Sequence, residues 1–102
     1  MGIDLRWEDE RGKELAYLGD QAFLVCRFLS PADATDFPCL RYVDPAGDTV
    51  FNQAQIKDVI WELESLSKKP LPPKVGRHLQ AVLEIARQAE GKTHTYIKFH
   101  GD

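Results

Sequence analysis

The chain has 102 residues and a formal net charge of −3; 43% of its residues are hydrophobic and 28% are charged. These values are typical of one water-soluble domain, and they argue against disorder, against a bilayer-spanning segment and against nucleic acid as the partner. The start, Met1-Gly2-Ile3-Asp4, has no basic stretch followed by an apolar run, so we expect an unprocessed cytoplasmic protein, complete from Met1 to Asp102. The two cysteines, Cys26 and Cys39, are too few for a structural zinc site, and we expect both to be buried and reduced.

The N-terminal residues predict a β-hairpin. Ile3, Leu5 and Trp7 alternate with polar residues, which is the pattern of a strand with one buried face. Residues 10–13 then supply a turn in which Gly12 suits a positive φ. Residues 14–18 are expected to return as a second strand, although their composition also suits a helix.

Residues 21–29 form a short apolar segment that fits either a buried strand or a buried helix. Ser30-Pro31 ends this segment, and residues 32–38 are expected to form a loop. The β-branched and aromatic content of Cys39–Val43 predicts a strand. The Pro and Gly of Asp44–Asp48 predict a turn, so that Thr49–Phe51 would return as the second strand of a hairpin.

Two amphipathic helices follow. Asn52 is placed as an N-cap, and Gln55 three residues later has the spacing of a capping box. Apolar residues at helical spacing extend this helix to Lys68-Lys69, where Pro70 stops it. A second helix is predicted from about Lys74 to Glu90, and Thr93–Phe99 is predicted as a closing strand.

The expected fold class is therefore α+β, with one domain over residues 1–102. Because each helix is apolar on one side only, both need a partner surface. We expect an antiparallel or mixed sheet of about four to five strands with two helices packed on one face. The closing strand would enter this sheet beside the N-terminal strand or at an edge.

Three segments resemble a group of short, uncharacterised bacterial proteins. They are the start Met1-Gly2-Ile3-Asp4, the segment from Asp44 to Gln53, and the end from Thr95 to Asp102. The likeness covers most of the chain apart from residues 18–36. No activity comes with that group, so the resemblance implies a free-standing bacterial protein and no catalytic residue.

The closing strand carries the most suggestive polar side chains. Alternation places His94, Tyr96, Lys98 and His100 on one face, which resembles a binding surface. His94 and His100 are six positions apart, about 20 Å along a strand, so the pair alone cannot bind one zinc ion. The competing interpretation is the wet outer face of a sheet.

Other residues have paired interpretations of the same kind. Trp61 lies off the apolar stripe of its helix, so it either anchors a partner or packs beneath the second helix or the long loop. Asp44, Asp48 and Asn52 suggest a cation site, but a turn and a helix cap explain them without metal. His78 borders an apolar stripe and is expected to be a satisfied, half-buried histidine.

The chain contains no phosphate-cradling glycine loop and no nucleophile elbow, and Glu62 and Glu64 lie on different helix faces, so an enzyme is disfavoured. We expect no cofactor and no metal. The leading hypothesis is a non-enzymatic module that binds another protein or a second copy, possible forms being an immunity-protein-like inhibitor or a homodimer. A small-ligand sensor or enzyme using His94, Lys98 and His100, with Arg41 as a possible fourth residue, and a weak nucleic-acid binder are the alternatives.

Overall fold

A four-stranded sheet forms one layer of the molecule in a computed structural model that describes residues 2–29 and 36–101. The strands are β1 (Ile3–Asp9), β2 (Glu14–Leu18), β3 (Asp48–Phe51) and β4 (Thr95–Gly101). Their order is β2-β1-β4-β3, and every neighbouring pair is antiparallel. The closing strand therefore lies beside the N-terminal strand, in the interior of the sheet.

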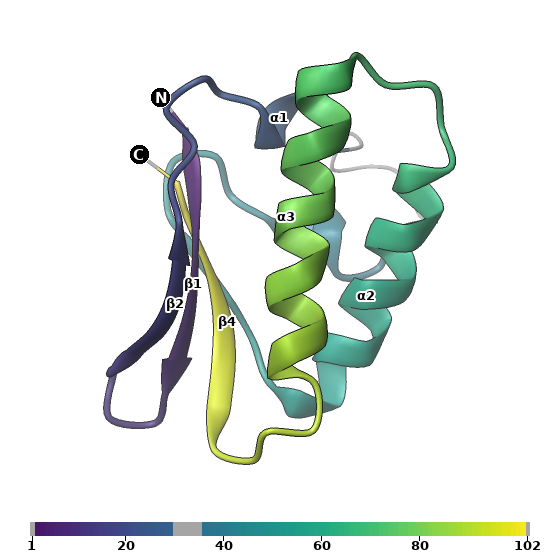
Figure 1. The fold of residues 1–102 in the computed structure, drawn as a ribbon. Coiled ribbons are helices and arrows are strands. Elements are labelled where there is room, and N and C mark those ends of the chain that lie inside the picture. Colours follow the sequence, from purple (N-terminus) through teal and green to yellow (C-terminus); the bar gives the residue numbers. More distant parts are fainter. Residues whose placement is uncertain (1, 30–35, 102) are drawn as a thin grey trace.

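Two helices, α2 (Gln53–Ser67) and α3 (Pro73–Ala89), form a second layer on one face of this sheet (Figure 1). The predicted α+β architecture is thus confirmed. The apolar core between the layers includes buried side chains from both helices and from β1, β3 and β4, among them Leu5, Phe51, Leu63, Leu79, Val82 and Phe99. Within residues 2–29 and 36–101, no helix has the length and apolar content needed to cross a membrane.

The start of α2 has the capping box predicted from the sequence. The Asn52 side chain accepts a hydrogen bond from the Gln55 amide at 3.1 Å, and the Gln55 side chain accepts one from the Asn52 amide at 3.0 Å. Two amide donors that the helix itself leaves unpaired are satisfied in this way. The N-terminal hairpin is also confirmed, and Gly12 in its turn has a φ of +80°.

The second predicted hairpin is wrong. Cys39–Val43 does not form a strand, because residues Leu40–Tyr42 form a 3₁₀ turn, η1. The physical reason is a contact from α2: the buried Glu62 carboxylate accepts hydrogen bonds from the amides of Cys39 and Leu40. These amides are therefore not available to a sheet, and within the described part of the chain β3 pairs only with β4.

The closing strand begins two residues later than predicted. Thr93 and His94 precede β4, and His94 has a φ of +61°, outside the strand region of backbone space. From Thr95 onward the predicted alternation holds, with Thr95, Ile97 and Phe99 buried and Tyr96, Lys98 and His100 half-buried on the opposite face.

The ambiguous segment 21–29 contains a four-residue helix, α1 (Val25–Phe28). The predicted stop at Ser30-Pro31 and most of the predicted loop 32–38 lie outside the described residues. Both cysteines are free, as predicted, but Cys26 is exposed and only Cys39 is buried, which corrects the expectation for Cys26. Cys26 lies on the side of α1 opposite the buried Val25 and Phe28.

Candidate functional site

The face of the sheet that carries no helix is lined by charged side chains that form pairs between neighbouring strands. The register places His100 between Asp4 and Asp48, and it places Lys98 beside Arg6. His100 Nδ1 contacts the Asp48 carboxylate, and this hydrogen bond holds the pKa of Asp48 below its usual value. His100 therefore has an acidic residue opposite it on each neighbouring strand, whereas Lys98 and Arg6 face each other and depend on diagonal acidic neighbours.

The remaining charges of this face are paired in the same way. Lys98 Nζ lies 3.4 Å from Glu8 Oε1, and Arg6 Nε lies 3.9 Å from Glu14 Oε1. The Tyr17 hydroxyl donates a hydrogen bond to Asp4 Oδ2 at 2.8 Å. The predicted row of basic side chains is therefore largely neutralised within the sheet itself.

His94 does not join that row. Its Nδ1 lies 3.2 Å from Glu10 Oε2 at the end of the N-terminal hairpin. His94 and Tyr96 instead border a shallow pocket of about 260 Å³ at the start of α2. The Gln53 side chain in this pocket already donates to Ala89 O and Thr95 Oγ1, both at 3.0 Å, so its amide group fastens α2 to the start of β4.

Trp61 stands on the solvent side of α2 with 62% of its surface exposed. The competing interpretation, in which it packs beneath the second helix or a loop, is therefore wrong. Tyr42, the last residue of η1, is exposed to 63%, and the Arg41 guanidinium lies over its ring at 4.7 Å. The hydrogen bonds from the Cys39 and Leu40 amides to Glu62 hold η1 against α2. Trp61 and Tyr42 therefore lie on two elements in direct contact.

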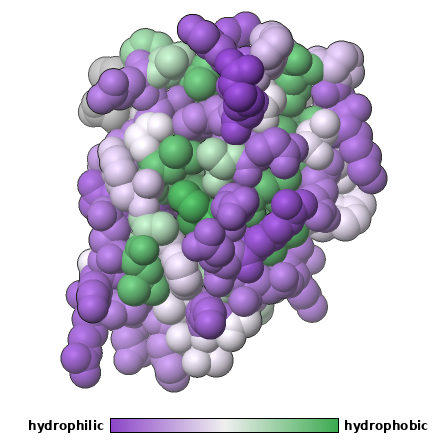
Figure 2. All heavy atoms as spheres, in the orientation of Figure 1, coloured by the Kyte–Doolittle hydropathy of each residue, from purple (hydrophilic) through white to green (hydrophobic). Residues whose placement is uncertain are grey.

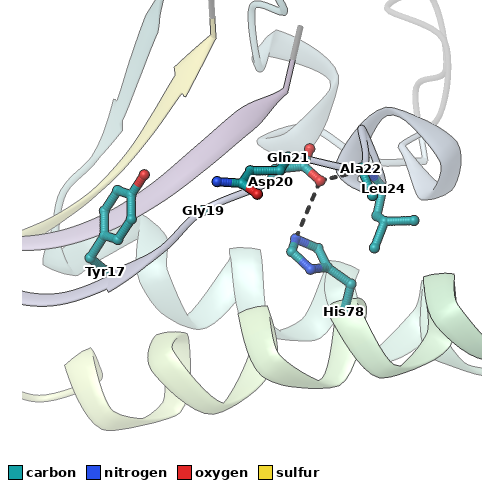
Figure 3. Close-up of a pocket in the computed structure, with 7 residues that line it drawn as sticks. All are labelled: Tyr17, Gly19, Asp20, Gln21, Ala22, Leu24 and His78. Atoms are coloured by element: carbon teal, nitrogen blue, oxygen red, sulfur yellow. Dashed lines mark hydrogen bonds and ion pairs between the residues drawn. The ribbon is translucent and has the colours of Figure 1, made fainter.

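A second pocket lies where β2 ends and the chain turns towards α1 (Figure 3). It has a volume of about 450 Å³ and is lined by Tyr17, Gly19, Asp20, Gln21, Ala22, Leu24 and His78. His78 reaches it from α3, with Nε2 at 3.7 Å from Asp20 Oδ1, and among the described residues this nitrogen has no hydrogen-bond partner. The expectation of a half-buried histidine is confirmed, but the expectation that its hydrogen bonds are satisfied is not met at Nε2.

The buried Asp20 organises the chain around this pocket. Its carboxylate accepts hydrogen bonds from the amides of Ile3, Leu24 and Val25 at 2.6–3.1 Å. One side chain therefore ties the first residue of β1 to the first turn of α1. Such a carboxylate is chiefly structural, because the backbone donors occupy its oxygen atoms.

Sequence reasoning missed both Asp20 and the buried Glu62. A signal existed for each. Asp20 precedes Leu24 by four residues, a spacing at which an acidic side chain can accept from the amides of a short helical turn. Glu62 lies three residues after Val59 and four before Leu66, so its angle places it at the margin of the apolar stripe of α2.

The Asp44, Asp48 and Asn52 side chains, for which the sequence favoured a turn and a helix cap over a cation site, are bound within the chain. Asp44 Oδ1 accepts from the Ala46 amide at 2.9 Å, Asp48 is held by His100, and Asn52 caps α2. Within the described part of the chain, no group of three or more His, Cys, Asp or Glu side chains is placed to hold a metal ion. Comparisons with known protein families, curated protein sequences and solved structures give no match to this chain.

Proposed function

We propose that this protein works by binding another protein, with Trp61 as the central contact of the interface. The observation that carries the proposal is the 62% exposure of this tryptophan on a well-packed helix. An exposed indole leaves a large apolar surface in water, and burying it against a partner regains that free energy. Tryptophan is also one of the residue types that contribute most to binding at protein interfaces.

The surroundings of Trp61 suit an interface. Lys57 and Asp58 are exposed on α2, Lys68 is exposed directly after its end, and the three would form a charged rim around the ring. A polar rim that excludes water from a central aromatic anchor is the common arrangement at interfaces. The opposite side of α2 is fixed by the buried Ile56, Val59 and Leu63, so the anchor stands on a rigid support.

The competing functions have less support. A ligand site or a nucleic-acid site on the open face of the sheet needs free basic groups. Lys98 and Arg6 each have an acidic neighbour within 4 Å, and His100 contacts Asp48. An anionic ligand would have to displace these neighbours, which would offset the gain from binding.

The experiment that tests the proposal is site-specific photo-cross-linking in bacterial cells that produce the protein. A benzoylphenylalanine placed at position 61 is expected to give a discrete adduct with one protein. The same group at Gln80, which is exposed on α3, is the matched control and should give no such adduct. The captured protein is then purified and its affinity measured by calorimetry.

In that measurement, Trp61→Ala should weaken binding by about 30-fold or more, which corresponds to about 2 kcal/mol at an interface hot spot. Gln80→Ala should leave the affinity unchanged. Equal affinities of the wild-type protein and Trp61→Ala, or equal labelling from positions 61 and 80, would show that Trp61 is not the binding residue.

A further inference from the structure

The two edges of the sheet differ in how they are covered. On the β3 edge, Thr49 Oγ1 accepts a hydrogen bond from the Asp44 amide at 3.0 Å and donates to Tyr42 O at 3.4 Å, so the preceding segment lies against this strand. On the β2 edge, the described residues place no strand beside β2 except β1. The outer backbone groups of β2 are therefore free to pair with another strand.

The composition of β2 is unusual for an uncovered edge. Its residues 15–18 are Leu-Ala-Tyr-Leu, with no lysine and no proline to discourage pairing. Leu15 is 41% exposed and Tyr17 is 49% exposed. Tyr17 is opposite Arg6 in the register, so it lies on the open face of the sheet. Alternation along β2 places Leu15 on the same face, at the register irregularity between Trp7 and Glu8.

The helix side of this edge is also incompletely covered. Hydrophobic side chains reach the surface between α3 and the sheet (Figure 2). Trp7, Leu18 and Ile85 pack against the core but remain partly accessible. The apolar margin between α3 and strands β1 and β2 is thus only partly covered.

We propose that this edge binds a second copy of the chain, with the two β2 strands antiparallel about a two-fold axis at Ala16. This register places Leu15 of each copy opposite Tyr17 of the other, and Ala16 opposite Ala16. Four strands from each copy then form one continuous sheet of eight. The pairing adds interstrand hydrogen bonds on an edge that is otherwise satisfied only by water.

A second copy fits this edge because the strand is complementary to itself. An aromatic side chain opposite an aliphatic one is a favourable cross-strand pair, and the two-fold axis produces that pair twice. The small Ala16 side chain lets the helix sides of the two copies approach. The nearest acidic group on the strand, Glu14, lies 3.9 Å from Arg6, which reduces the repulsion between the two acidic hairpins.

The test is the mass of the protein in solution, measured by light scattering and by sedimentation equilibrium at micromolar concentrations. We expect the wild-type chain to have twice the 11.6 kDa of one copy. Leu15→Lys should give a folded monomer, because it removes both Leu–Tyr pairs and places a charged group on the edge strand of each copy. Val50→Lys is the matched control, since Val50 is 52% exposed on the opposite edge strand, and it should remain dimeric.

The register is tested by cysteine cross-linking in a Cys26→Ser background. Ala16→Cys should form a disulfide between copies on mild oxidation, because directly opposed residues of an antiparallel pair lie about 4.5–5.5 Å apart at Cα. Val50→Cys should not. A monomeric wild-type protein, or a dimer that survives Leu15→Lys and forms no Ala16→Cys cross-link, would overturn the inference.

This inference does not rest on the Trp61 proposal, since β2 and α2 are different surfaces. Trp61→Ala should therefore leave the dimer intact. A dimer that is lost in Trp61→Ala and kept in Leu15→Lys would assign self-association to α2, and it would contradict the β2 inference while identifying the partner of Trp61 as a second copy.

Discussion

The short helical turns α1 and η1 are each held by a buried carboxylate, but the two carboxylates lie at very different distances along the sequence from the turns that they bind. Each turn presents backbone amides to a buried carboxylate, Asp20 for α1 and Glu62 for η1. Asp20 lies four residues before Leu24, the N-cap of α1, whose amide it binds. Glu62 instead reaches η1 from α2, which begins eleven residues after η1 ends. The comparison shows that a turn can be fixed by a local capping residue or by a distant carboxylate, and that only the first is visible in a short stretch of sequence.

The largest effect is expected at Glu62. Glu62→Ala removes a fully buried acceptor, leaves the amides of Cys39 and Leu40 without partners and opens a cavity. We expect the free energy of unfolding to fall by about 3–5 kcal/mol, the range for loss of a buried polar partner together with side-chain volume. Urea unfolding followed by circular dichroism measures this change.

Glu64→Ala is the matched control for this variant. Glu64 is two residues away on the same helix, and its partially exposed carboxylate pairs with Arg87 at 3.0 Å. An exposed pair of this kind contributes about 0–1 kcal/mol. If Glu62→Ala were no more destabilising than Glu64→Ala, η1 would not depend on the buried carboxylate.

A smaller loss is expected at Asp20. Asp20→Asn keeps one carbonyl oxygen but turns an amide NH₂ towards at least one of three backbone donors, and it removes the negative charge that faces His78. We expect a loss of about 2 kcal/mol, as for a buried donor left without its acceptor. Hydrogen exchange should also quicken at the amide of Leu24, because Ile3 and Val25 share Oδ2 whereas Leu24 alone donates to Oδ1, the position that the NH₂ group would take.

The exposed Asp58→Asn is the control for Asp20→Asn, and it should change stability by no more than a few tenths of a kcal/mol. An exchange rate at Leu24 that stays at the wild-type level in Asp20→Asn would show that other contacts hold the start of α1. In that case η1 would depend on a buried carboxylate and α1 would not.

The difference between the two turns also explains what the sequence could predict. The Asn52 capping box, the two striped helices and the alternation of β1 are signals carried by neighbouring residues, and the structure has all of them. Cys39–Val43 has the composition of a strand, yet it forms η1 because Glu62 takes two of its amides. That contact joins positions more than twenty residues apart, so no local pattern predicts it.

The candidate sites follow the same logic. Helical angle alone placed Trp61 off the apolar stripe, and the structure has it exposed. Alternation alone placed Tyr96, Lys98 and His100 on one face. It could not predict that Asp48 and Glu8 would neutralise two of these groups, because strand order and register depend on tertiary packing.

The reactivity of the two thiols also compares the two turns, because Cys26 lies in α1 and Cys39 directly precedes η1. Burial, together with the negative charge of the neighbouring Glu62, raises the pKa of Cys39 to about 11. Cys26 is exposed on α1. At pH 8, a disulfide reagent such as dithiobis(nitrobenzoate) should modify Cys26 quickly and Cys39 slowly, because the thiolate is the reactive form. Cys26→Ser should remove the fast phase alone, and equal rates for the two thiols would contradict the assignment.

The raised pKa of Cys39 predicts that the stability of the protein falls at alkaline pH. The folded pKa of Cys39, about 11, lies above the ordinary thiol value near 9, so the folded state keeps a proton that the unfolded state loses. The stabilisation is complete below pH 9 and is lost as the pH rises to about 11. Glu62→Gln should lower the pKa of Cys39, since it removes the neighbouring negative charge. The pH range over which stability falls should then become narrower. Cys39 should also react faster with the disulfide reagent, while Cys26 keeps its rate. An unchanged Cys39 rate in a folded Glu62→Gln protein would show that burial alone sets the pKa, and that the carboxylate acts on η1 only through its hydrogen bonds.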